Sequence, residues 1–110
     1  MIFDKKENTS IITQENVSVV ELVKKTQILY PKFRNDNIII VLTLLNSLEL
    51  KDLIEFLDIS NTHRASNHSF VIVSNKIELN IVPDELVVVP TLQEAFDIVE
   101  MEDMERDLGI

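Results

Sequence analysis

The chain has 110 residues, 45% hydrophobic and 26% charged, which is the composition of one globular domain, 1–110, and not of a disordered chain. Nineteen acidic against ten basic side chains give a formal net charge of -9, which opposes direct binding to nucleic acid or to an anionic membrane. Cysteine is absent, which excludes disulfides, thiolate metal sites and cysteine nucleophiles and fits a reducing cytoplasm.

The N-terminal segment predicts a hairpin followed by a helix. Residues 1–3 and 10–13 have the pattern of short strands on either side of a polar segment. Ser18 and Glu21 form a capping box, in which a hydroxyl accepts from first-turn amides and a carboxylate reaches back. We expect this helix to end near Tyr30, because a proline follows it.

The middle of the chain predicts a buried strand and a second helix. Residues 38–44 are a β-branched run without alternation, which is typical of a strand covered on both faces in a mostly parallel sheet. Apolar residues then recur at helical spacing over 50–57, in a helix expected to open after Asn46 and Ser47. We expect that helix to continue as far as Ala65.

The last third predicts two more strands, over 69–74 and 86–89, and a terminal helix opened by a capping box of Thr91 and Glu94. The order of elements predicts an α/β fold with a mixed, mostly parallel sheet of four or five strands flanked by three helices. The single glycine is Gly109, which excludes a glycine-rich phosphate loop. The absence of a long apolar run predicts no signal peptide and no membrane span.

Side chains that could carry chemistry are few. His63 and His68 lie five residues apart with Arg64 between them, and no neighbouring carboxylate completes a metal site. We interpret both as ordinary surface or helix-end histidines. No serine sits in a sharp strand-to-helix turn with small neighbours, as a hydrolase nucleophile requires. The sequence therefore predicts no catalytic residue, no metal and no cofactor.

Negative charge is concentrated at the C-terminal end. Between Glu94 and Asp107 there are seven carboxylates and one basic residue, Arg106. Acidic residues near a helix C-terminus are unfavourable for the helix dipole. One interpretation is a solvated, solubilising surface; the other is a docking segment for a basic protein partner within the acidic end at 101–110. The candidate interaction residues are Met101, Glu102, Met104, Glu105, Asp107 and Leu108, with Ile110 as a further apolar side chain.

The whole layout resembles the STAS-type fold of bacterial anti-sigma-factor antagonists and anion-transporter tails. Four segments further resemble a group of small bacterial proteins whose genes tend to lie beside that of ribonuclease Z: residues 54–57, 60–64, 68–73 and above all 88–102. The resemblance implies a regulatory domain that acts through protein contacts, with no defined activity.

The chain departs from both relatives in the residues that matter most. Signalling antagonists carry a phosphorylated serine in a glycine-containing turn at the start of the second helix. Here that turn has no glycine, and Ser47 is the one possible phosphoacceptor, at a poorly matching position. Two histidines cannot supply the two-zinc cluster of ribonuclease Z, so the chain cannot be that nuclease.

Three functions follow from these observations. The leading hypothesis is a non-enzymatic, STAS-like interaction or regulatory domain that presents a helix surface and its acidic end to a protein partner. The second is an accessory protein of RNA processing that binds ribonuclease Z. The third is a small-ligand-binding or enzymatic domain whose pocket uses residues too ordinary to recognise.

Overall fold

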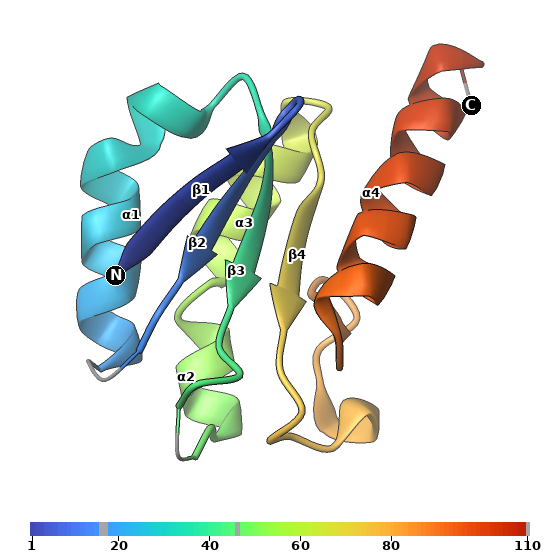
Figure 1. The fold of residues 1–110 in the computed structure, drawn as a ribbon. Coiled ribbons are helices and arrows are strands. Elements are labelled where there is room, and N and C mark those ends of the chain that lie inside the picture. Colours follow the sequence, from blue (N-terminus) through green and yellow to red (C-terminus); the bar gives the residue numbers. More distant parts are fainter. Residues whose placement is uncertain (16–17, 46, 110) are drawn as a thin grey trace.

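The computed structural model describes residues 1–15, 18–45 and 47–109, which form one sheet with helices on both faces (Figure 1). The strands are β1 (Ile2–Lys6), β2 (Thr9–Thr13), β3 (Asn37–Val41), β4 (Phe70–Val73) and β5 (Val87–Val89). The helices are α1 (Val19–Phe33), α2 (Leu50–Ile54), α3 (Leu57–Ala65) and α4 (Leu92–Asp107), with a short 3-10 helix η1 (Leu79–Ile81) between β4 and β5.

The five strands lie in sequence order, β1-β2-β3-β4-β5. β1 and β2 form an antiparallel hairpin, and the pairs β2–β3, β3–β4 and β4–β5 are parallel. Each parallel connection carries helical structure, as a crossover between parallel strands requires. The predicted α/β class and the mixed, mostly parallel sheet are confirmed.

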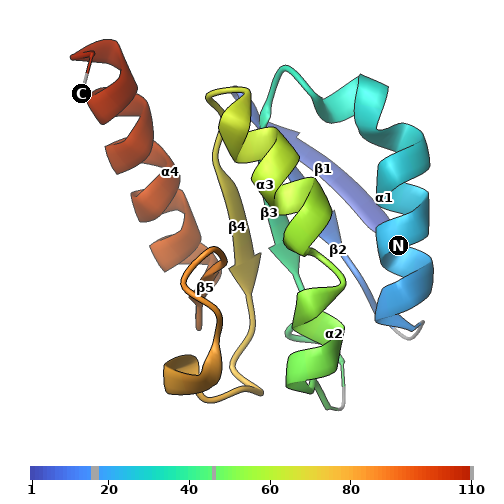
Figure 2. The ribbon, with the colours of Figure 1, turned by 180° about the vertical axis from the view of Figure 1, so that it is seen from behind.

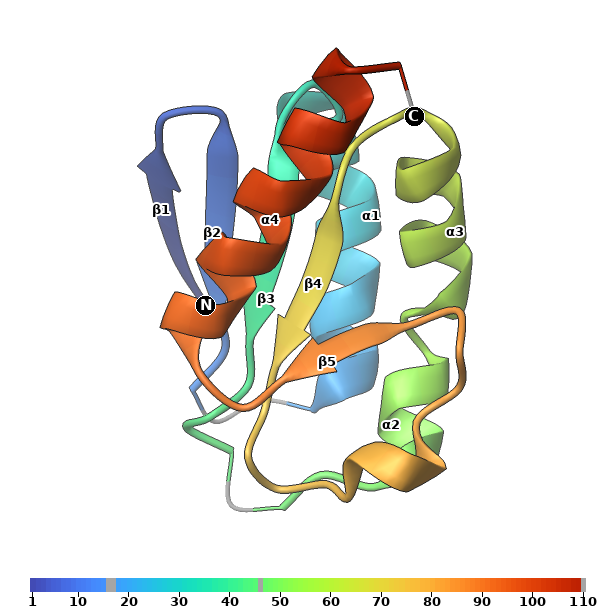
Figure 3. The ribbon, with the colours of Figure 1, turned by 90° about the vertical axis from the view of Figure 1, so that its right-hand side faces the viewer.

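β3 lies at the centre of the sheet and is buried along its whole length. One row of side chains across the sheet, Ile12, Ile40 and Ile72, packs under α1, α2 and α3. The next row, which includes Ile39 and Val71, packs under α4. Figure 3 shows α4 in front of the sheet with α1 behind it, and Figure 2 shows α1 and α3 on the opposite face. The run of β-branched residues does not alternate because helices cover both of its faces.

Several strand boundaries differ from the predictions. The hairpin strands are longer than expected and leave only Glu7 and Asn8 as the turn, because backbone pairing at a solvent-exposed edge tolerates polar side chains. β3 ends at Val41, before the predicted limit at residue 44, because its neighbour β4 ends at Val73, the residue that pairs with Val41. Leu44 is accordingly 56% exposed.

Both early helices also differ from the prediction. α1 continues past Tyr30 through Pro31: the proline removes one helical hydrogen bond and crowds the preceding turn, but Arg34 N–H still donates to the Tyr30 carbonyl at 2.9 Å. The helix expected over 50–65 is divided into α2 and α3 at Phe56, which is fully buried and lies 6.3 Å from the Phe70 ring. No helix in the described ranges is long and apolar enough to cross a membrane.

Candidate interaction surface

α4 is the helix that carries most of the predicted interaction residues. It begins where the sequence predicts, because the Thr91 hydroxyl accepts from the Glu94 N–H at 3.2 Å. Its inner face places Ala95 and Val99 against the sheet, where both are buried. This side of the helix is therefore packed in the core and is not accessible to a partner.

The second half of α4 is anchored by polar contacts. Arg64 of α3 donates to the Glu102 carboxylate at 2.6 Å, and both side chains are mostly buried. Arg106 donates to the Ser69 hydroxyl at 3.0 Å and to Asp103 at 2.6 Å. These contacts hold the acidic end of α4 against the starts of β3 and β4, so that it forms a fixed surface.

Asp103 is the most connected carboxylate of this cluster. It accepts from the amides of Asn8 and Asn37, each with a shortest distance of 3.1 Å, and from Arg106. Burial acts to raise the pKa of Asp103, but the hydrogen bonds from Arg106, Asn8 and Asn37 together hold it below its usual 3.8. The folded state thus stabilises the ionised form of the Asp103 carboxyl group.

Replacing Asp103 by alanine is expected to lower the free energy of unfolding by about 1–3 kcal/mol, because three donors lose their acceptor. A lowered folded-state pKa means that this contribution is present above pH 3.8 and is lost as the pH falls through the lowered pKa. Urea unfolding of wild type and Asp103→Ala at neutral pH measures the difference in the free energy of unfolding. The matched control is Asp107→Ala on the exposed end of the same helix, which should change stability by less than about 0.5 kcal/mol.

The outer face of α4 exposes a row of apolar side chains. Met101, Met104 and Leu108 are 50%, 61% and 73% exposed, and they line a shallow groove whose walls carry the carboxylates of Asp97, Glu100 and Glu105. We call these six residues the α4 groove. Monomeric proteins seldom expose several large apolar side chains together unless the surface binds something.

The predicted interaction residues divide between the two sides of the helix. Met101, Met104, Glu105 and Leu108 lie in the α4 groove, whereas Glu102 faces Arg64 and Asp107 lies outside the groove. Ile110 lies outside the described residues. Sequence reasoning missed Asp97 and Glu100, although Asp97 precedes Glu100 by three residues and Met101 by four, spacings that make it the helical neighbour of both.

Ser47, the possible phosphoacceptor, is exposed in the loop between β3 and α2. The helix begins later than predicted, at Leu50, and Asn46 lies outside the described residues. Two carboxylates already occupy the first turn, where Asp52 accepts from the Glu49 N–H at 2.9 Å. A phosphate added nearby would be repelled by these charges, so a switch at Ser47 stays a prediction with little electrostatic support.

His63 lies at a helix end, as one of the two interpretations from the sequence has it, but it is not at the surface, which corrects the other. It is fully buried in the last turn of α3, where its Nε2 donates to the Asp36 carbonyl at 2.6 Å and Tyr30 donates its hydroxyl to Nδ1 at 2.7 Å. A carbonyl can only accept, which fixes these roles for a neutral ring. Burial lowers the pKa of His63, against the raising effect of the Asp36 carbonyl. Within the described ranges no group of three ligating side chains could hold a metal.

Comparison with known proteins supports the fold. No protein-family model matches the sequence, and neither does any curated protein. Among solved structures, the protein TM1081, determined by NMR, superposes with a TM-score of 0.65 at 20% identity, over 89% of this chain and 86% of that one. A serine-to-glutamate variant of RsbS from Moorella thermoacetica superposes with a TM-score of 0.65 at 13% identity, over 96% and 97% of the two chains. The fold is therefore STAS-like, as the sequence predicted.

Proposed function

We propose that this protein is a regulatory domain without catalytic activity that binds a basic protein partner through the α4 groove. The STAS-like fold supports this proposal, because the anti-sigma-factor antagonists that the sequence resembles act through protein contacts. The single observation that carries it is the composition of the groove. Three exposed apolar side chains lie among three carboxylates on a helix whose other side is already packed.

The anchoring of α4 makes the groove suitable for binding. The contacts from Glu102, Asp103 and Arg106 fix the helix before any partner arrives. A surface that is already ordered loses little conformational entropy on association. Methionine side chains also adapt their shape to a partner at small cost. None of the three exposed apolar groove residues belongs to a core cluster, so the fold does not account for them.

The charge of the groove specifies the chemistry of the partner. Asp97, Glu100 and Glu105 frame the apolar row, and the described ion pairs include none of them. A complementary surface therefore presents apolar residues bordered by lysine or arginine. Ribonuclease Z, suggested by the resemblance of residues 88–102, is one candidate to test.

Replacing Met104 by lysine is expected to reduce partner binding at least about tenfold. The new ammonium group would repel the basic side chains of the partner and would have to lose its hydration at the centre of the interface. The assay is affinity purification with quantitative mass spectrometry, followed by binding of the purified partner. The matched control is Ile28→Lys, which changes an apolar side chain that is 76% exposed on α1, outside the groove.

Comparing Met104→Lys with Ile28→Lys tests the proposal more sharply than deleting residues 101–110 would. Such a deletion would also remove the contacts of Glu102, Asp103 and Arg106 to the rest of the fold, so lost binding could reflect lost structure. A partner retained equally by wild type, Met104→Lys and Ile28→Lys would contradict the proposal. Recovery of partners without a basic surface would contradict the charge argument.

A further inference from the structure

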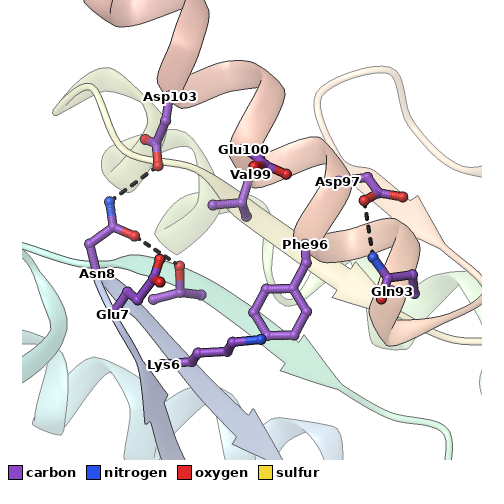
Figure 4. Close-up of a pocket in the computed structure, with 10 residues that line it drawn as sticks. Lys6, Glu7, Asn8, Gln93, Phe96, Asp97, Val99, Glu100 and Asp103 are labelled. Atoms are coloured by element: carbon purple, nitrogen blue, oxygen red, sulfur yellow. Dashed lines mark hydrogen bonds between the residues drawn. The ribbon is translucent and has the colours of Figure 1, made fainter.

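A cavity of about 290 Å³ lies between the turn of the β1–β2 hairpin and the side of α4 (Figure 4). It is separate from the α4 groove, although Asp97 and Glu100 contribute to both. The volume is close to the lower limit of about 300 Å³ for pockets that bind small molecules. The lining residues are Lys6, Glu7, Asn8, Thr9, Gln93, Phe96, Asp97, Val99, Glu100 and Asp103.

The cavity has an aromatic wall with a cation on it. The ammonium group of Lys6 lies 5.0 Å from the centre of the Phe96 ring, a distance at which the ring attracts a cation. Figure 4 shows the Lys6 side chain extending across the cavity toward this ring. Lys6 is exposed, and its ammonium is in none of the ion pairs of the described residues. It can therefore leave the ring without breaking a salt bridge.

The other charges of the cavity favour a cation. Of its four carboxylates, Asp103 is neutralised by Arg106, which leaves Glu7, Asp97 and Glu100 against the single ammonium of Lys6. Val99 and the Phe96 ring supply apolar surface for an alkyl chain. An ammonium group on a short alkyl chain matches both features, whereas an anion matches neither.

We propose that this cavity binds an alkylammonium group, and that Lys6 occupies the cation position while the cavity is free. The incoming ammonium displaces Lys6 from Phe96 and is held there by the ring and by the field of the carboxylates. The ligand class is a small primary amine, either a free diamine or a lysine side chain presented by another molecule. This binding goes beyond the proposed function, because Met101, Met104 and Leu108 take no part in it.

The test is a titration of the full chain followed by backbone amide NMR. The probes are diaminobutane, its neutral analogue butanediol, and a lysine blocked at both backbone ends. Diaminobutane should shift the amides of the hairpin turn and of the first half of α4, and butanediol should not. Equal affinity for blocked lysine would identify a presented side chain as a sufficient source, and weaker binding would identify the free diamine.

Two variants give opposite expected results. Lys6→Met removes the internal competitor, so the dissociation constant for diaminobutane should fall about two- to fivefold. Phe96→Leu keeps apolar bulk and removes the ring quadrupole, so the constant should rise by a similar factor of about two to five. Glu100→Gln should weaken binding more than Glu105→Gln, which removes the same charge from the groove alone.

Diffuse attraction to an acidic protein predicts a different outcome. Shifts spread over the outer face of α4, or a dissociation constant that Phe96→Leu leaves unchanged, would overturn the inference. Circular dichroism of each variant verifies that the fold is retained. Because Met104→Lys changes the groove and leaves the cavity residues intact, failure of diamine binding and failure of partner binding can be told apart.

Discussion

Alanine in place of Ile39 and alanine in place of Ile40 are each expected to lower the free energy of unfolding by about 2–5 kcal/mol. Both side chains are fully buried, but Ile40 packs under α1 to α3 and Ile39 packs under α4. Removing three methyl or methylene groups from either loses burial and leaves a cavity between sheet and helix. Equilibrium unfolding in urea measures both effects.

The pair of substitutions tests whether the sheet is covered on both faces. If one face of the sheet were open to solvent, alanine at the isoleucine on that face would lower the free energy of unfolding only slightly. The effects of Ile39→Ala and Ile40→Ala would then differ by several kilocalories per mole. Ile28→Ala on the exposed side of α1 is the control, with an expected change below about 0.5 kcal/mol. A small effect at Ile39 would specifically contradict the packing of α4 on the sheet.

Replacing His63 by alanine is expected to cost about 2–4 kcal/mol at neutral to mildly alkaline pH. The substitution leaves a cavity against Phe70, and it deprives the Asp36 carbonyl and the Tyr30 hydroxyl of their partner. Buried polar groups that lose a partner carry their full desolvation cost. The loss in the free energy of unfolding is thus larger than the cavity alone would cause.

His63 should also make stability depend on pH. The pKa of His63 in the folded state lies below the ordinary 6.5, so between these two values the imidazole is protonated in the unfolded chain and neutral in the folded one. The free energy of unfolding is therefore highest above pH 6.5 and falls as the pH drops from 6.5 through the lowered pKa. Urea unfolding at a series of pH values should show this loss in wild type and in His68→Gln, and should not show it in His63→Ala. The same acid-side loss in His63→Ala would assign it to other groups.

The covered central strand could be predicted because its physical cause is local. An unbroken run of β-branched residues at 38–41 has no polar side to present to water, so both faces must be covered. Helix starts at Ser18 and Thr91 were equally predictable, since each depends on one hydroxyl and an amide three residues later. Element ends were harder, because strand ends depend on the length of a neighbouring strand.

The candidate interaction surface could be predicted from the sequence only in part. α4 carries apolar residues on both sides, so spacing alone does not reveal which side faces the sheet. Glu102 looked like one more surface carboxylate until Arg64, far away in the sequence, was placed beside it. The cavity was invisible for the same reason, because it joins the turn at Asn8 to Asp103 across 95 residues. The buried position of His63 likewise depends on Tyr30 of α1 and on Asp36, the residue before β3.

The position of β1 bears on how this domain can associate with others. β1 is the outermost strand, with β2 on one side of it, so the other side leaves backbone groups open to a strand from another molecule. Asp4, Lys5 and Lys6 make this border charged, and charged border strands resist the edge-to-edge growth that leads to aggregates. Lateral pairing with a strand of another molecule is therefore disfavoured at this border of the sheet.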